Sequence, residues 1–125
     1  MQAEPTTKVK VKYPGEREFD LIRQPAEKPE ELLQQLFDQF NDGSRHECEE
    51  FKACPQCRSL SSNDFIRLDE QWYQCKSVGW EAVTPKFVQD IDLKVRQHPL
   101  FMTSPWVALD RVMFALNHAV DPFDL

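Results

Sequence analysis

The sequence lacks any apolar run that approaches the roughly 18–20 residues of a membrane-spanning helix. It also lacks an N-terminal apolar core behind basic residues, so we expect no secretory signal peptide. Basic residues are in the minority, because 15 Lys and Arg stand against 21 Asp and Glu and leave a net charge of −6. These absences predict a soluble, cytoplasmic protein that does not enter a membrane.

No segment of the chain is basic, and nothing supplies the long stripe of Lys and Arg with which proteins displace counterions from a nucleic acid. No nucleophile–base pair, phosphate-cradling loop or paired carboxylates stand out either. The composition therefore favours an acidic protein that is not an enzyme and that binds another protein.

The N-terminal third predicts a β-hairpin followed by a helix. Residues 8–13 alternate between lysine and other side chains, which is the period of a half-buried strand, and 18–22 alternate again after a turn at Pro14-Gly15. Pro29 then stands at a first helical position, ahead of apolar residues at three- and four-residue spacing. These apolar residues are Leu32, Leu33, Leu36, Phe37 and Phe40.

The C-terminal third predicts two helices. Thr84-Pro85 and Ser104-Pro105 each place a hydroxyl residue before a proline, which is typical of a helix start. The second helix carries a wide apolar stripe, so we expect it to be deeply buried or partly covered by a partner. That stripe comprises Trp106, Leu109, Met113, Leu116 and Val120, with Val107, Val112 and Phe114 beside it.

Four cysteines, Cys48, Cys54, Cys57 and Cys75, stand in the middle of the chain. Without an export signal, metal binding by thiolates is favoured over two disulfides. Two residues separate Cys54 from Cys57, a spacing that lets both sulfurs reach one metal from a tight turn. Strand-like segments at 65–68 and 71–74 predict a hairpin that returns Cys75 toward this pair, and 80–83 could add a third strand.

The stretch 54–80 resembles the zinc ribbon family, which is found in transcription factors, insertion-sequence transposases and many adaptor modules. The matching residues are Cys54-Pro55-x-Cys57, Ser59, Trp72-Tyr73-Gln74-Cys75 and Gly79-Trp80. In the family the second knuckle reads Cys-x-x-Cys-Gly, whereas here Val78 precedes the glycine and cannot bind a metal. The resemblance covers about a fifth of the chain and implies a small β module with a zinc site.

Three interpretations of the missing ligand stay open. In the favoured one, Cys48 replaces it and completes a closed site of four thiolates, the usual form of structural zinc. In the second, His46 is the fourth ligand; in the third, the metal is lost and aromatic packing holds the module. A catalytic zinc and a thiol redox pair are both disfavoured, because no acid–base partner and no helix start accompany the cysteines.

Together these features predict an α+β fold in a single domain, 1–125. A β-hairpin plus helix occupies 1–44, the zinc-ribbon-like module 45–83, and a helical hairpin 84–125. The predicted function is that of an adaptor or regulatory protein with a structural zinc, which binds another protein within a transcription, transposition or other nucleic-acid-processing complex.

The alternative function is direct DNA or RNA binding through the ribbon and the basic strand at 8–13. The residues predicted to contact a partner are Trp72, Tyr73, Trp106 and Phe114, with Phe123 in the tail that follows. The same apolar face could also serve a contact between two copies of the chain.

Overall fold

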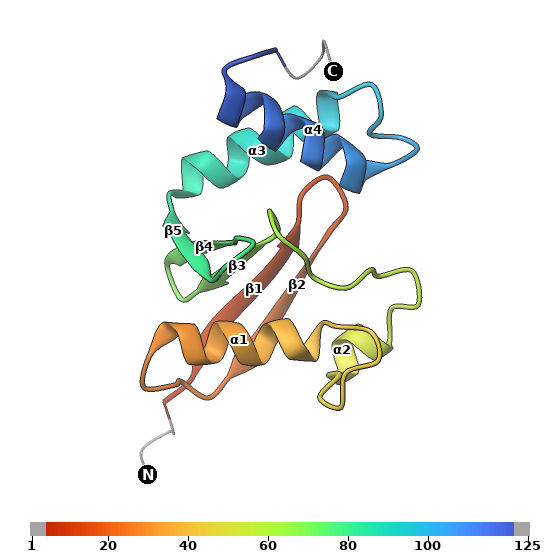
Figure 1. Ribbon diagram of the computed structural model, residues 1–125. Coiled ribbons are helices and arrows are strands. Elements are labelled where there is room, and N and C mark those ends of the chain that lie inside the picture. Colours follow the sequence, from red (N-terminus) through yellow and green to blue (C-terminus); the bar gives the residue numbers. More distant parts are fainter. Residues whose placement is uncertain (1–4, 122–125) are drawn as a thin grey trace.

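The computed structural model describes residues 5–121. These residues form one five-stranded antiparallel sheet with helices on both of its faces (Figure 1). The elements are β1 (Thr7–Tyr13), β2 (Arg17–Arg23), α1 (Pro29–Gln39), α2 (Glu49–Lys52), β3 (Phe65–Leu68), β4 (Gln71–Cys75), β5 (Trp80–Val83), α3 (Pro85–Gln97) and α4 (Pro105–His118). The strands lie in the order β2-β1-β3-β4-β5. The predicted α+β class is confirmed.

The sheet joins two hairpins that are far apart in the sequence. β1 pairs with β2 in the first hairpin and β3 pairs with β4 in the second, as the alternating sequence predicts. β1 also pairs with β3, from Val9 opposite Leu68 to Lys12 opposite Phe65. Strands from the predicted segments 1–44 and 45–83 therefore belong to one sheet.

One face of the sheet packs against α1 and α2. Alternate residues of β1, Val9, Val11 and Tyr13, point to this side and are at most 2% exposed. They contact the apolar face of α1 that the three- and four-residue spacing predicts, and Leu33, Leu36 and Phe40 are fully buried there. The helix begins at Pro29 as predicted.

The opposite face packs against α3 and α4, which lie together on that side (Figure 1). Phe65 of β3 and Trp72 of β4 meet edge to face, with ring centroids 6.4 Å apart, and both rings belong to the core that the two helices close. Thr84 accepts a hydrogen bond from the Phe87 amide at 3.1 Å, which is the predicted N-cap of α3.

Two local predictions differ from the structure. The short helix α2 was not predicted, because its four residues are too few for an apolar period; it buries Phe51 in the α1 core. α4 begins at Pro105 as predicted, but the Ser104 side chain makes no capping hydrogen bond.

The predicted stripe of α4 is only partly buried. Leu109, Val112 and Met113 face the core, together with Ala108 and Ala115, whose small side chains let the helix approach α3 and the sheet. Trp106, Leu116 and Val120 are instead about half exposed. The buried face therefore centres on the two alanines, which a search for large apolar residues does not reveal.

Gly15 and Asp92 fasten the first hairpin to α3. Gly15 has φ +73°, and a Cβ on it would stand 2.6 Å from Val95 Cγ1, so a larger residue does not fit this turn. The Gly15 amide donates to Asp92 Oδ1 at 2.7 Å, and Arg96 Nε donates to Oδ2 at 2.9 Å. Burial favours the neutral carboxyl, but the Gly15 amide, Arg96 and Lys12 outweigh it and lower the pKa of Asp92.

We predict that Asp92→Ala lowers the free energy of unfolding at pH 7 by about 1–3 kcal/mol, because it leaves the Gly15 amide without its charged acceptor. A carboxyl with a lowered folded pKa stabilises the fold above its unfolded pKa of about 3.9, and this contribution disappears as the pH falls through the folded value. Urea unfolding at pH 7 and pH 2 measures both effects, and the difference between wild type and variant should shrink at pH 2.

Asp90→Ala is the matched control, since Asp90 lies on the same helix in an exposed pair with Lys86 and should change stability by no more than about 0.5 kcal/mol. A loss at pH 2 as large as at pH 7 would show that the Asp92 charge does not hold the turn.

Candidate functional site

The Cys54–Cys57 knuckle lies directly after α2. Its backbone turns back on itself, because the Cys57 amide donates to the Cys54 carbonyl at 3.0 Å and the Cys54 amide donates to Phe51 at 3.1 Å. The Arg17 guanidinium, from the start of β2, donates to Cys54 Sγ. The two sulfurs therefore lie together at the end of the first hairpin, as the Cys-x-x-Cys spacing predicts.

Cys57, the last residue of the knuckle, packs against the α1 core. Burial raises the pKa of its thiol, while the neighbouring Tyr13 hydroxyl and Arg17 favour the thiolate without reversing the shift. Tyr13 is 1% exposed. Its burial is the main cause that raises the pKa of the phenol, and the neighbouring Cys57 raises this pKa further. Because the Tyr13 hydroxyl is buried with no well-formed hydrogen bond, it is an unsatisfied polar group directly behind the knuckle.

Arg58 anchors the knuckle through a buried cluster of charges. Its guanidinium donates to both oxygens of Asp64, at 2.7 and 2.8 Å. Its Nε donates to Glu16 Oε2 at 2.9 Å, and its Nη2 lies 2.8 Å from the same oxygen in an ion pair. It also lies over the Tyr13 ring, 4.8 Å from the centroid. Asp64 is fully buried and additionally accepts from the Ser61 amide at 2.9 Å. This cluster ties the cysteine loop to β3 and to the β1–β2 turn.

No sequence pattern predicts the Arg58 cluster. Its members come from positions 16, 58 and 64, and no helical or strand period relates them. The only available signal was the position of Arg58, directly after the second cysteine of the knuckle.

Cys75 ends β4 and is 6% exposed. Its backbone pairs with the residues that precede β3: the Cys75 amide donates to the Asp64 carbonyl at 2.9 Å, and the Asn63 amide donates to the Cys75 carbonyl at 2.7 Å. Burial and the charge of Asp64 raise the pKa of the Cys75 thiol to about 11. The predicted hairpin therefore delivers Cys75 to the Asp64 end of the sheet.

Cys48 stands at the N-cap of α2 and His46 lies in the exposed turn before it. The Cys48 amide donates to the Gln39 carbonyl at 3.1 Å, so this segment is fixed to the end of α1. Burial raises the pKa of the Cys48 thiol, and the charges that act on it are those of Glu50 and Arg23. Cys48 and Cys57 both pack against the α1 core, but different charges act on their thiols.

Within residues 5–121, no three His, Cys, Asp or Glu side chains are gathered closely enough to hold a metal ion. The structure brings Cys54 and Cys57 together but does not add Cys48, Cys75 or His46 to them as a ligand group. Two thiolates do not complete a structural zinc site, which requires four protein ligands. The zinc site with four cysteine ligands accordingly stays a prediction from the sequence.

The four predicted contact residues divide into two pairs. Trp72 is 8% exposed in the α3–α4 core, and Tyr73 is half-buried against the α1 core on the other side of the sheet. Trp106 and Phe114 are each 49% exposed on α4. Phe123 lies outside the described residues.

No helix among residues 5–121 is both long enough and apolar enough to span a membrane. No protein-family model, curated protein or solved structure matches the chain in comparisons with known proteins. The resemblance of residues 54–80 to zinc ribbons therefore rests on the residues of that stretch that match the family pattern.

We predict that Arg58→Ala lowers the free energy of unfolding by about 3–5 kcal/mol, because it leaves the carboxylate of Asp64 buried without its partner. Chemical denaturation at pH 7 measures the loss. Lys86→Ala removes a cation from an exposed pair and should cost no more than about 0.5 kcal/mol. The double change Arg58→Met with Asp64→Leu should recover much of the loss; a double variant no more stable than Arg58→Ala would assign the effect to packing on Tyr13.

Metal analysis of the purified protein tests the predicted ligand set. Four thiolates acting together give one zinc per chain, which Cys48→Ala should remove because three sulfurs leave the site open. Emission spectrometry after exhaustive dialysis measures the ratio. Zinc that persists in Cys48→Ala but is lost in His46→Ala would move the fourth ligand to His46. Wild-type protein without zinc would contradict both ligand sets and leave packing alone to hold the knuckle.

Proposed function

We propose that this chain is a non-enzymatic adaptor that binds another protein through one exposed ridge of α4. The ridge consists of Trp106, Asp110, Phe114 and His118, which recur every four residues and so follow one another along the helix surface. Ridges of this spacing are the surfaces with which helices most often pack against other helices. The partner surface that fits it best is therefore an amphipathic helix.

The observation that carries this proposal is the half exposure of two aromatic residues on a helix whose opposite face is fully packed. Trp106 and Phe114 each expose 49% of their surface, and the His118 ring stacks on Phe114 with centroids 3.9 Å apart. Aromatic side chains are the most frequent anchors of protein interfaces, because they bury a large area with little loss of conformational freedom.

Asp110 adds a second condition on the partner, which concerns the charge of its contact surface. It lies between the two aromatic residues and makes no ion pair or hydrogen bond to any residue in the described part of the chain. A carboxylate at the centre of a helix–helix contact must meet a cation or a hydrogen-bond donor, since burying it alone is costly. The partner helix we propose thus carries a Lys or Arg between two apolar residues.

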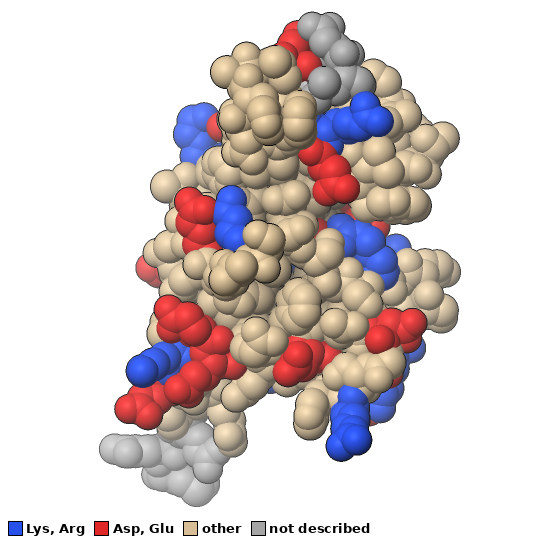
Figure 2. Space-filling view, in the orientation of Figure 1, with Lys and Arg blue, Asp and Glu red and all other residues tan. Residues whose placement is uncertain are grey.

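Direct nucleic-acid binding is less well supported by the charges. Two of the three lysines of β1 are already paired: Lys10 binds Glu18 and Asp20, and Lys12, which is 8% exposed, binds Glu18 and Asp92. Figure 2 shows Lys and Arg interspersed with Asp and Glu, without a continuous basic stripe on the face it draws. The proposal that the protein partner belongs to a nucleic-acid-processing complex rests only on the resemblance to zinc ribbons.

A photo-crosslinking amino acid at position 114 identifies the protein that covers the ridge in cells, and calorimetry with the purified partner tests the proposal. We expect Trp106→Ala to weaken binding by about 2 kcal/mol, roughly 30-fold, because it removes an aromatic anchor. Asp110→Lys should weaken binding further by opposing the partner's cation.

Leu93→Ala is the matched control, since Leu93 is an apolar residue of α3 that is 54% exposed but lies outside the ridge. Equal weakening by Leu93→Ala and Trp106→Ala would contradict a contact centred on α4. Crosslinks only to a second copy of the chain would replace the adaptor by a self-interface. Retention of random-sequence oligonucleotides at low salt, with no protein crosslinked, would favour the nucleic-acid alternative.

A further inference from the structure

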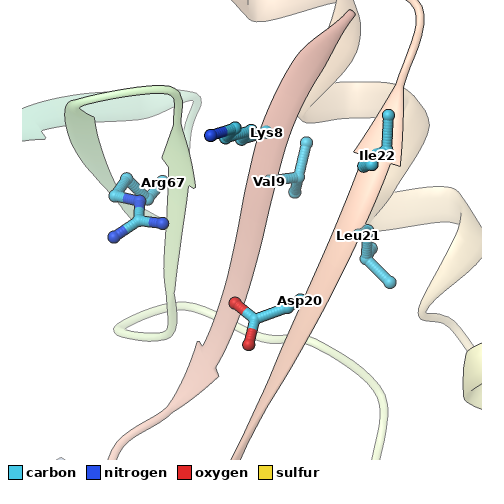
Figure 3. Close-up of a pocket in the computed structure, with 6 residues that line it drawn as sticks. All are labelled: Lys8, Val9, Asp20, Leu21, Ile22 and Arg67. Carbon is cyan, nitrogen blue, oxygen red and sulfur yellow. The ribbon is translucent and has the colours of Figure 1, made fainter.

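A hollow of about 320 Å³ lies on the part of the sheet formed by β2, β1 and β3 (Figure 3). Lys8 extends from β1 toward β3, the strand that carries Arg67, and Asp20 and Ile22 border the hollow from β2. Ile22 is 65% exposed, so α3 and α4 do not cover this part of the sheet as they cover Trp72.

The hollow holds two cations that lack an acidic partner. Lys10 and Lys12 are bound by acids of β2 and α3, but neither Lys8 Nζ nor the Arg67 guanidinium forms an ion pair within residues 5–121. The carboxylate of Asp20, the one acid that lines the hollow, is already held by Lys10 at 3.1 Å. The local charge is therefore positive on a chain whose net charge is −6.

Arg67 is fixed in position before any ligand arrives. It lies opposite Lys10 in the β1–β3 register and opposite Trp72 in the β3–β4 register, and its guanidinium is 5.7 Å from the Trp72 ring centroid. Its Nε is buried and has no hydrogen-bond partner. An oxygen atom that reaches the half-buried guanidinium would form a strong, charge-assisted hydrogen bond with it.

We propose that this hollow binds a carboxylate of a protein partner, an Asp or Glu side chain or a chain end, between Lys8 and Arg67, with an apolar neighbour against Ile22. The inference deepens the proposed adaptor function by adding a second, acidic contact. A nucleic acid fits less well, because the acids Glu18 and Asp20 lie on β2, beside the hollow, and would repel the neighbouring phosphates of the strand.

Small probes test binding in the hollow without involving α4. The result for the hollow is therefore independent of the result for the proposed partner contact of the α4 ridge. The probes are the blocked peptides acetyl-Leu-Glu-Leu-amide and acetyl-Leu-Gln-Leu-amide, inorganic phosphate and a random-sequence single-stranded oligonucleotide. We expect saturable shifts of the Arg67 Nε–Hε resonance with the Glu peptide and much weaker ones with the Gln peptide. Lys8→Met should weaken binding of the Glu peptide roughly tenfold, since it removes one charge-assisted bond.

Lys8→Met should fold normally because Lys8 is exposed, and Arg67→Lys provides a second variant that keeps the charge but loses the two-pronged geometry. Lys94→Met, an exposed cation of α3, is the control and should bind the Glu peptide like wild type. Equal shifts with the Gln peptide, or equal affinity in Lys8→Met, would overturn the inference. Binding of phosphate alone would mark an adventitious ion only, and preferential binding of the oligonucleotide would replace the peptide by a nucleic acid.

Discussion

The pairing of β1 with β3 is the interaction on which the rest of the structure depends. A two-stranded hairpin is marginally stable alone, and each hairpin of this chain is short. By joining them, the four paired positions from Val9–Leu68 to Lys12–Phe65 make one sheet with two apolar faces, one for α1 and α2 and one for α3 and α4. The alternation of side chains along each strand then divides the apolar residues between the two cores.

The Arg58 cluster follows from the same pairing. β1 and β3 bring the Tyr13 end of the first hairpin close to Asp64, and Arg58 fills the space between them with one guanidinium that binds both Asp64 and Glu16. A guanidinium suits this position because its five donors can satisfy two carboxylates at once. The cysteine knuckle is thereby attached to the sheet by polar contacts within the protein itself.

Sequence reasoning succeeded where a local rule decides the outcome. The alternation in 8–13 and 18–22, the prolines at positions 29, 85 and 105, and the Thr84 cap each predict an element that the structure contains. It could not predict the strand order, because β1–β3 pairing links residues almost sixty positions apart and leaves no periodic signal. It also left open whether the apolar stripe of α4 is buried or partly exposed, since size alone does not distinguish a packed leucine from an exposed tryptophan.

For the cysteines, too, sequence spacing predicts only contacts between residues that are close in the chain. Spacing alone brings Cys54 and Cys57 together, because two intervening residues close a turn. Whether Cys48 and Cys75 join them depends on distant chain segments, and in the described structure each belongs to a different local environment: Cys48 near Glu50 and Arg23, Cys75 near Asp64.

The ion pairs within the protein divide its cations into two groups, those already bound to an acid of the chain and those available to a ligand. Lys10 and Lys12 face acids of the neighbouring strand, so their positive charge is used within the fold. Lys8 and Arg67 line the same side of the sheet, yet no acid of the described chain pairs with either. On an acidic protein, cations left without an internal partner are the groups best placed to meet an acid from outside, and the contact of Arg67 with Trp72 lowers the conformational freedom that this guanidinium loses on binding.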